Sequence, residues 1–374
     1  MNNMKNEKYF IALYNDGKTN AELAKLFKIN VRTVSKWLAQ LRTENKIKRR
    51  SEMTIFKEKS TEVSPKKYEV HYTGMITELR NHINSVEPLK VVKSTKKHKG
   101  DTLIVQFSDW HVGRKIIDEY GNILYNEAVF EVRVQSLIYE MITLLDRYIK
   151  RGTPIRDVVI ISTGDILDGQ GIFSTQETLS ELSPPFQVMK GVHAIQKFIL
   201  ALLERKLEVY FYGVKGNHGE IRVNGRNRDP NANWDLMLYL ILDFWSKTIL
   251  KTKAVHINYS ELDYINFKIQ GWKYHARHIA PMQSETAGGK AKFLGWAKRH
   301  EFDALVYGHY HHWGVWDRSK VTVFRGGSLT GADEFAETLA EESDPIQMMW
   351  GCNEKRPLTF FYPVDLGKKE KKKD

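Results

Sequence analysis

The stretch TLIVQFSDWH, residues 102–111, begins with a short apolar run and ends with the polar residues Asp109 and His111. An apolar run of this length with a polar ending is typical of a buried strand. Beyond residue 101, further apolar strands alternate with helical stretches, and this alternation indicates an α/β protein built in layers. In open sheets of this kind, ligands gather beyond the carboxyl ends of the strands.

Three further stretches have the same form, an apolar strand followed by a polar ending. They are DVVIISTGDILDG (157–169), EVYFYGVKGNHGE (208–220) and ALVYGHYHH (304–312). Their endings supply Asp165, Asn217, His218, His309, His311 and His312. At the carboxyl ends of an open sheet, these side chains would converge in one crevice. Glycines beside the endings, at 164, 216 and 308, let the chain turn away sharply without a Cβ clash.

The side chains of these endings are carboxylates, imidazoles and an amide, a set that suits Mn²⁺, Fe or Zn²⁺ better than a thiophilic metal. A buried aspartate at a strand end is also able to bridge two metals about 3.5–4 Å apart. The single cysteine, Cys352, excludes an intrachain disulfide framework and a thiolate zinc site. The endings therefore predict a metal centre built from oxygen and nitrogen ligands.

The order D-x-H, G-D, G-N-H, a single histidine and G-H-x-H resembles the calcineurin-like metallophosphoesterase superfamily over roughly residues 101–330. The resemblance implies a four-layer α-β-β-α sandwich with two divalent metal ions, Mn²⁺ being favoured and Fe, Zn²⁺ and Mg²⁺ being alternatives. The ligands that it implies are Asp109, His111 and His311 for the first metal, Asn217 and His309 for the second, and Asp165 as the bridge. His218 would be the general acid for the leaving oxygen, or would stabilise the phosphorane. A metal-bound hydroxide would attack phosphorus in line.

The single histidine of the pattern has two candidates in GWKYHARHIAP, His275 and His278, which point to opposite faces if the segment is a strand. The family's spacing from the hairpin glycine Gly271 favours His278 as a metal ligand. The third motif departs from the family, because GNHGE places its acid at Glu220 and leaves the usual partner of His218 open. Asp168 either orients a metal-binding side chain or stabilises a turn.

The net charge of +12 belongs to the first part of the chain. Residues 1–100 contain 22 Lys and Arg against 10 Asp and Glu, whereas residues 101–374 contain 35 of each. This asymmetry favours an anionic partner, most simply nucleic acid, over a merely solubilising charge. The longest apolar run, LMLYLIL, is too short for a membrane span, and MNNMKNEKYF is not a secretory signal. We therefore expect no membrane partner and a cytoplasmic location in a bacterium or a phage-infected cell.

Residues 1–48 resemble a small all-α helix-turn-helix unit. In NAELAKLFKINVRTVSKWLAQL, apolar residues recur at helical spacing on two short helices, with Asn30 as the expected N-cap of the second. The expected apolar face of the first helix is Leu23, Ala24, Leu26 and Phe27. Lys28 stands where such turns often carry glycine. The resemblance implies a second helix that enters the DNA major groove with Arg32, Thr33, Lys36 and Gln40. A plain helical hairpin for protein contacts is the alternative.

The composition indicates a basic linker at residues 49–100 and a basic disordered tail at residues 367–374, and the resemblance implies a metallophosphoesterase domain at residues 101–366. The loop after G-N-H carries Arg222, Arg226 and Arg228, which either hold a phosphodiester backbone or solvate the loop. Trp110 and Trp313 flank the metal motifs, either as aromatic core or as platforms for bases.

The whole arrangement resembles phage-type metallophosphoesterases related to the nuclease subunits of SbcCD-type repair exonucleases. The first hypothesis is a two-metal DNA phosphodiesterase or nuclease that the N-terminal unit recruits to DNA. The second is a phosphatase or nucleotide phosphodiesterase with another substrate, and the third is a non-catalytic DNA-binding regulator on the same scaffold. Because helix-turn-helix units often act in pairs, a homodimer or a partner subunit is compatible with all three.

Overall fold

The protein is described here by a computed structural model, which describes residues 10–11, 14, 18–43, 47, 100–151, 154–173, 176, 179–222, 229–280, 287–331 and 343–367. The chain divides into two compact units, Met1–Ser85 and Val86–Asp374. Apart from Gly100 and Gly367, the predicted linker 49–100 and the predicted tail 367–374 lie outside the described residues.

The first unit contains helices α2 (Asn20–Leu26) and α3 (Val31–Thr43). Thr19 and Glu22 form a capping box at the start of α2. Asn30 accepts a hydrogen bond from the backbone N–H of Arg32 at 2.8 Å, which confirms it as the N-cap of α3. Lys28, between the helices, has a φ of 54°, the left-handed conformation for which glycine is the usual residue.

A small apolar core holds α2 and α3 together. Leu23 and Ala24 from α2 pack with Val34, Leu38 and Leu41 from α3. The expected apolar face of α2 was wrong at Leu26, which is 55% exposed. Leu26 lies two positions beyond Ala24, about 200° around the helix, and therefore points away from α3.

The second unit is built around a six-stranded sheet with the order β13-β12-β1-β4-β5-β6. Its parallel strands are β1 (Asp101–Phe107), β4 (Ile155–Ser162), β5 (Glu208–Gly213) and β6 (Val255–Tyr259). Strands β12 (Ile346–Asn353) and β13 (Arg356–Asp365) add an antiparallel edge. Strand β1 is buried along its whole length, as the apolar run in the sequence predicts.

A second sheet of five strands has the order β10-β11-β9-β8-β7. Strands β8 (Trp272–Arg277), β9 (Ala304–Tyr307) and β11 (Val321–Arg325) run parallel to one another. Strands β7 (Tyr264–Ile269) and β10 (Gly314–Arg318) are antiparallel to their neighbours. A short separate hairpin is formed by β2 (Ile116–Ile117) and β3 (Ile123–Tyr125).

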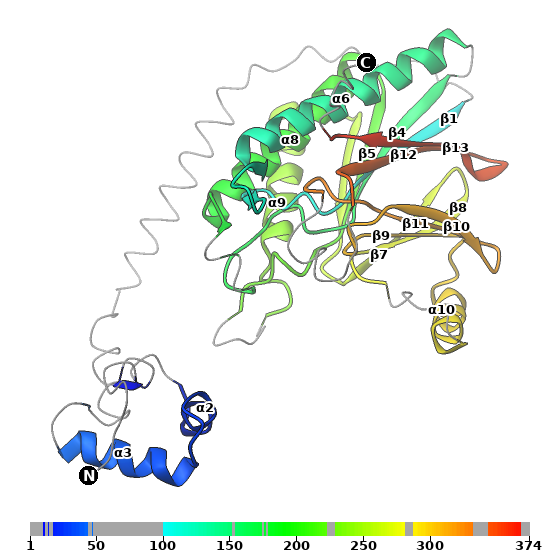
Figure 1. Cartoon of the computed structure of the whole chain (residues 1–374). Coiled ribbons are helices and arrows are strands. Elements are labelled where there is room, and N and C mark those ends of the chain that lie inside the picture. The colour runs from blue at the N-terminus through cyan, green and yellow to red at the C-terminus, as the bar shows by residue number, and fades with distance from the viewer. Residues whose placement is uncertain are drawn as a thin grey trace, which may run out of the picture. The chain divides into compact units, whose positions relative to one another are not determined.

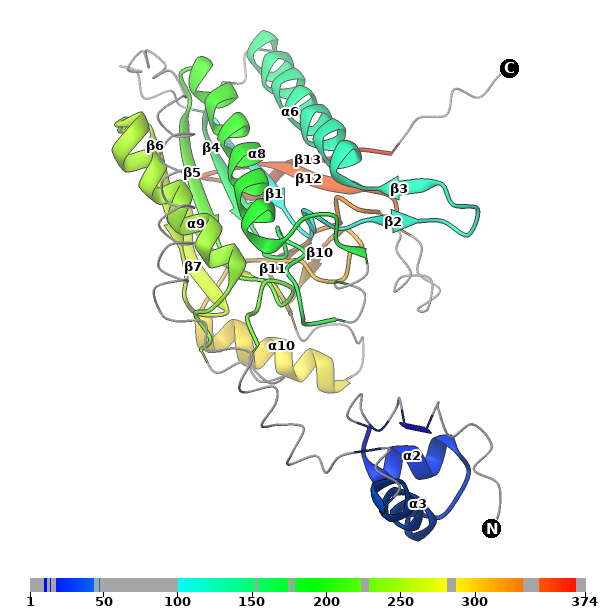
Figure 2. The same cartoon turned by 90° about the vertical axis from the view of Figure 1, so that its left-hand side faces the viewer.

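Helices cover the outer faces of both sheets, as Figures 1 and 2 show. Helices α6 (Glu127–Lys150), α8 (Pro184–Glu204) and α9 (Trp234–Trp245), which continues into a π-helical turn (Ser246–Leu250), pack on the six-stranded sheet. Helix α10 (Ala287–His300) packs on the five-stranded sheet. The two sheets enclose a further core that includes Ile104, Val159 and Trp350. These three cores separate four layers, which confirms the predicted α-β-β-α sandwich.

The predicted polar endings all follow carboxyl ends of parallel strands, but these strands do not belong to one open sheet. Strands β1, β4 and β5 belong to the six-stranded sheet, whereas β8 and β9 belong to the five-stranded sheet. The polar endings therefore come from both sheets, and they meet where the carboxyl ends of the parallel strands of the two sheets face each other. Among the described helices, none combines the length and apolarity that a membrane crossing needs.

Candidate metal centre

Five residues of the polar endings have a left-handed backbone. Their φ angles are 52° at Asp109, 45° at His111, 51° at Asp165, 76° at His309 and 60° at His311. Aspartate and histidine tolerate this conformation better than most residues, yet each such position still costs on the order of 1–3 kcal/mol. Strain of this kind persists where a local arrangement of side chains is required, so it marks the ends of these strands as a functional site.

Asp109, His111 and His311 form a first cluster of possible metal ligands. The Nε2 atoms of His111 and His311 are 3.1 Å apart, and Nε2 of His311 is 3.6 Å from Oδ1 of Asp109. The carboxylate of Asp109 also accepts the backbone N–H of His309 at 3.0 and 3.1 Å. Burial raises the pKa of Asp109, and the neighbouring His311 and His278 offset this effect only in part.

A second cluster converges on Nε2 of His278. This atom is 3.0 Å from Oδ2 of Asp165, 2.8 Å from Oδ1 of Asn217 and 3.2 Å from Nδ1 of His309. The other ring nitrogen, Nδ1, lies 2.8 Å from the Thr163 carbonyl oxygen, so it donates there. This contact fixes the tautomer of a neutral His278 and aims the Nε2 lone pair into the cluster.

The electrostatics of the second cluster favour a cation. Burial opposes protonation of His278, but Asp165 and Asp109 outweigh it and raise its pKa to about 9. Burial likewise opposes ionisation of Asp165, but His278 and His218 hold its pKa well below the usual range. The same carboxylate field that favours a proton on His278 favours a metal cation among these atoms.

The spacing of the side chains fits divalent metals. Two atoms that share one cation at about 2.1 Å lie about 3.0–3.4 Å apart for angles of about 90–109°. The contacts within the two clusters, from 2.8 to 3.6 Å, lie close to this range. Carboxylate, imidazole and amide donors form a set suited to two hard or borderline divalent cations. The structure thus brings together all seven residues predicted to hold metal.

His275 and His278 are clearly separated. His278 belongs to the second cluster, whereas His275 is buried beside α10. The Nδ1 atom of His275 is 2.7 Å from Oδ1 of Asn266, and its ring stacks on Tyr264 and Phe302. His275 therefore packs in the core of the five-stranded sheet and does not reach the cluster.

His218 lies at the edge of the first cluster, with its ring 4.4 Å from the ring of His111. Its side chain is 14% exposed, and Nδ1 is 3.3 Å from Oδ1 of Asp168. Gln176 lies 3.3 Å from the same nitrogen, and the ring of Phe173 packs on the imidazole. Burial opposes protonation of His218, but Asp165 and Asp168 outweigh it and raise its pKa.

Asp168 is buried between two imidazoles. Its Oδ1 atom is 3.4 Å from Nδ1 of His111 and 3.3 Å from Nδ1 of His218. Both rings therefore direct Nε2 away from Asp168. The two possibilities left open by the sequence are now distinguished, because Asp168 orients two site histidines. Glu220, the displaced acid of the G-N-H motif, instead pairs with Arg222 at 2.8 Å.

Asp235, in the first turn of α9, is a site residue that the sequence reasoning missed. Its carboxylate is fully buried and accepts the backbone N–H groups of Asp165 at 2.9 Å, Leu167 at 3.2 Å and Gly216 at 2.9 Å. It thereby fastens two ligand-bearing loops to each other. Burial and the charge of Asp165 raise its pKa to about 7. The only sequence signal is an acidic residue in a first helical turn, which usually indicates a cap.

The predicted DNA contacts are scattered. On α3, Arg32, Lys36 and Gln40 are exposed and Thr33 is half-buried, in a unit that is described separately from the metal clusters. Arg222 pairs with Glu220, and Arg226 and Arg228 lie outside the described residues. The base-stacking alternative for Trp110 was wrong, because its ring is buried among Phe107, Phe130 and Phe198. Trp313 is 40% exposed and stacks on Phe361.

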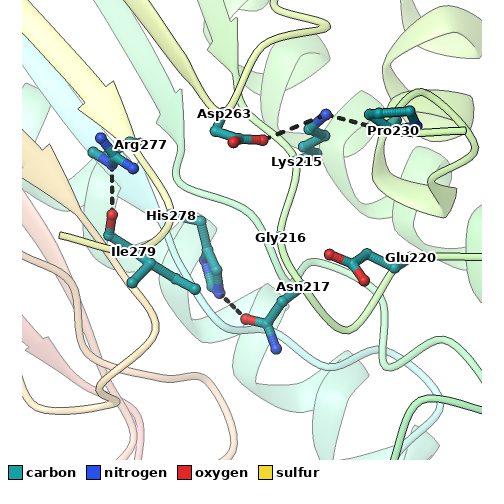
Figure 3. Close-up of a pocket in the computed structure, with 9 residues that line it drawn as sticks. All are labelled: Lys215, Gly216, Asn217, Glu220, Pro230, Asp263, Arg277, His278 and Ile279. Atoms are coloured by element: carbon teal, nitrogen blue, oxygen red, sulfur yellow. Dashed lines mark hydrogen bonds and ion pairs between the residues drawn. The ribbon is translucent and has the colours of Figure 1, made fainter. Parts of the chain in front are cut away.

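A pocket of about 280 Å³ opens beside the second cluster (Figure 3). Asn217 and His278 contribute to its wall and also to the cluster. Lys215 lies along another wall, where Nζ donates to the carbonyl oxygen of Pro230 at 2.8 Å and pairs with Asp263 at 3.4 Å. A group bound at the second cluster therefore has an adjoining space of its own.

Comparisons with known proteins found solved structures of low sequence identity. They include an archaeal phosphodiesterase, with 14% identity, coverage of 70% of this chain and 99% of that chain, and a TM-score of 0.33. A predicted phosphoesterase from Streptococcus pneumoniae has 14% identity, 72% and 99% coverage and a TM-score of 0.27. Vps29 from Entamoeba histolytica, in complex with Zn²⁺, has 14% identity, 71% and 99% coverage and a TM-score of 0.32.

No match was found among curated protein sequences. The family model for calcineurin-like phosphoesterases matches residues 102–313. This range contains the strands β1, β4, β5, β8 and β9 and both metal-ligand clusters. Because the match spans more than half of the 374 residues, the chain belongs to the calcineurin-like phosphoesterase family.

Proposed function

We propose that the protein is a two-metal DNA phosphodiesterase, with Mn²⁺ as the favoured metal. The proposed phosphoester hydrolysis rests on one observation, the two adjoining clusters within a phosphoesterase fold. The clusters are Asp109–His111–His311 and Asp165–His278–His309. Two divalent metals, when bound, would polarise the phosphoryl oxygens and make water nucleophilic near neutral pH. Oxygen and imidazole ligands suit Mn²⁺, with Fe, Zn²⁺ and Mg²⁺ as alternatives.

The chain's own residues would orient the phosphate and supply a proton. His218 has a raised pKa, so its protonated form persists to higher pH than that of an ordinary histidine. Its Nδ1 lies 3.3 Å from Oδ1 of Asp168, an ion pair when the ring is protonated, and its ring lies beside that of His111. Nε2 would then donate its proton to the leaving oxygen of the phosphoester. Because Phe173 packs against His218, part of the water around the imidazole is excluded.

The choice of DNA as the substrate rests on the N-terminal unit. Helix α3 of this unit exposes Arg32 and Lys36, and the excess positive charge of the chain lies within residues 1–100. Basic side chains at these positions would contact DNA phosphates and hold the substrate near the hydrolytic domain. The resemblance of the sequence motifs to SbcCD-type nuclease subunits is a further reason to propose DNA.

The first experiment is hydrolysis of end-labelled linear DNA, single- and double-stranded, by the full chain in Mn²⁺. Asp165→Asn should abolish hydrolysis, because Asp165 contacts His278 and orders the His218 loop through a 2.8 Å hydrogen bond. Asp317→Asn, on the exposed side of β10, is the matched control and should retain full activity. If both DNA forms survive while a chromogenic phosphodiester is cleaved, DNA is the wrong substrate.

A second experiment tests recruitment through α3. In the full chain, Arg32→Ala with Lys36→Ala should weaken binding of double-stranded DNA and lower the slope of log affinity against log salt by about 1.8. Removing the two exposed charges of Lys298 and Arg299 on α10 is the matched control. If both double variants behave alike, the N-terminal unit does not contact the DNA backbone.

The alternative functions predict other patterns. A phosphatase or nucleotide phosphodiesterase would cleave chromogenic esters and ignore the α3 substitutions. A non-catalytic regulator would bind DNA without cleaving either substrate. The presence of every predicted ligand within the two clusters and the residues beside them disfavours the regulator, because a scaffold without activity has no need of a complete site.

A further inference from the structure

The charges around the pocket beside the second cluster are not all balanced. Asp263 pairs with Lys215 at 3.4 Å, and Glu220 pairs with Arg222 at 2.8 Å. Arg277, which also lines the pocket, has no carboxylate within 4.0 Å among the residues that the structure describes. Arg277 is therefore the cation of this pocket that forms no close ion pair among the described residues, and the carboxylate of Asp263, which pairs with Lys215, acts on it only from beyond 4.0 Å.

The guanidinium of Arg277 is held in a fixed orientation. Its Nε donates to the carbonyl oxygen of Ile279, and its Cζ lies 3.8 Å from the ring centroid of Trp296. These two contacts fix the plane of the group and, among the described residues, use only one of its five N–H donors. The side chain is half-buried. A half-buried cation whose counter-charge is shared with Lys215 is costly, and a bound anion would lower that cost.

The position of Arg277 relates it to the reacting phosphate. Arg277 directly precedes His278, so their Cα atoms are about 3.8 Å apart. Figure 3 shows both side chains on the wall of the same pocket, with Asn217 between them and Glu220. A phosphate at the second cluster would have the next part of its molecule in this pocket. At about 280 Å³ the pocket is just below the usual range for small ligands, which suits a nucleotide fragment and excludes a duplex.

We propose that this pocket binds the phosphate adjacent to the scissile phosphate of a nucleotide chain, with Arg277 as the anion-binding residue. The inference rests on the proposed function in that it assumes a phosphate at the metal clusters. A planar guanidinium recognises phosphate through paired hydrogen bonds from its N–H groups. The pocket thereby selects substrates that carry two phosphates one nucleotide apart over isolated phosphomonoesters.

The test is a binding measurement that needs no turnover. Thymidine 3′,5′-bisphosphate and thymidine 5′-monophosphate are titrated into the Mn²⁺-loaded full chain by calorimetry. We expect the bisphosphate to bind roughly 10-fold more tightly, about 1.4 kcal/mol. Arg277→Gln should abolish this advantage and leave the affinity for the monophosphate unchanged. Arg277→Lys, which keeps the charge but not the planar fork, should retain part of it.

Arg356→Gln is the matched control. Arg356 is exposed at the start of β13, in the turn next to Asn353. Asn353 contacts Asp101 at the start of β1, the end opposite to the metal ligands. This variant should keep the full preference for the bisphosphate. A Mn²⁺ isotherm and a melting curve of each variant check that the metal site and the fold are unchanged.

Two outcomes would overturn the inference. One is equal affinity of the parent chain for both nucleotides, and the other is an undiminished preference for the bisphosphate in Arg277→Gln. If Arg277→Gln does not fold, the preference for the bisphosphate is measured in Arg277→Lys instead, and an undiminished preference there would overturn the inference. Failure of DNA hydrolysis with a preserved, Arg277-dependent preference would reject the DNA substrate and keep the phosphate subsite. Hydrolysis of DNA without a preference for the bisphosphate would keep the DNA substrate and reject the phosphate subsite.

Discussion

Replacing Asp235 by asparagine gives a sharp test of how the ligand loops are held. The carboxylate accepts three backbone N–H groups, two at Oδ2 and one at Oδ1. An asparagine oxygen in the place of Oδ2 keeps the bonds from Asp165 and Gly216, but its NH₂ group then faces the N–H of Leu167. One buried donor is left unsatisfied, at a cost of about 1–3 kcal/mol.

The pH dependence makes this prediction specific. The folded pKa of Asp235 is raised to about 7 from 3.8, so between these values the folded chain binds a proton that the unfolded chain has released. Its contribution to stability is full below pH about 4 and is lost as the pH rises through about 7, at about 1.4 kcal/mol per pH unit. The asparagine of the variant would not titrate. The deficit of Asp235→Asn should therefore shrink by about 3 kcal/mol between pH 5 and pH 8.

The assay is urea unfolding of the metal-free full chain and of Asp235→Asn at pH 5 and pH 8. At pH 5 the variant should be less stable, and at pH 8 the two chains should be nearly equal or the variant more stable. A deficit that grows from pH 5 to pH 8 would refute the reasoning, because it would mean that the three N–H groups outweigh burial and lower the pKa of Asp235. The exposed Asp317→Asn, measured under the same conditions, serves as the control for the loss of a surface carboxylate.

Four further substitutions test the site. Asp168→Asn should lower the pKa of His218, because the lost carboxylate stabilises the protonated ring, and the basic limb of the kcat/KM profile should move to lower pH. His278→Ala should remove one of the bound Mn²⁺ ions in a metal titration, whereas His275→Ala should keep both and lose about 2–4 kcal/mol of stability in urea unfolding. Loss of a metal in His275→Ala would contradict this assignment. Gly216→Ala should weaken Mn²⁺ binding, since the new Cβ would lie 2.0 Å from Oδ1 of Asp165; unchanged affinity would show that the loop can shift.

The metal-ligand clusters could be predicted because each ligand stands in a short motif after an apolar strand. Asp109 and His111 follow β1, and Asp165 follows β4, so local sequence already places them at strand ends. The pattern does not reveal which strands share a sheet. A single open sheet and a sandwich of two sheets both bring the carboxyl ends of the strands together. They differ in strand pairing, because β8 and β9 pair with each other in a sheet that does not contain β1.

The residues that escaped prediction act through distant partners. Asp235 bonds to backbone groups 70, 68 and 19 residues away, and no sequence spacing encodes such contacts. The exposure of Leu26 depends on the rotation of α2 about its own axis relative to α3. Helical periodicity in the sequence fixes this rotation only loosely. Arg277 is an ordinary residue at the end of a strand until Trp296, on α10, is placed beside it.

The meeting of two sheets at the metal clusters has a consequence for stability. His111 and His311, which are 200 residues apart, come from opposite sheets, and their Nε2 atoms are 3.1 Å apart. A cation shared by these rings would act as a reversible cross-link between the halves of the sandwich, comparable to a disulfide that closes a long loop. At a free metal concentration 100 times its Kd, the folded chain would gain about 2.7 kcal/mol. Depletion of the metal would then weaken the contact between the two sheets. Amide hydrogen exchange would rise first along β1 and β9, because His111 and His311 follow these strands.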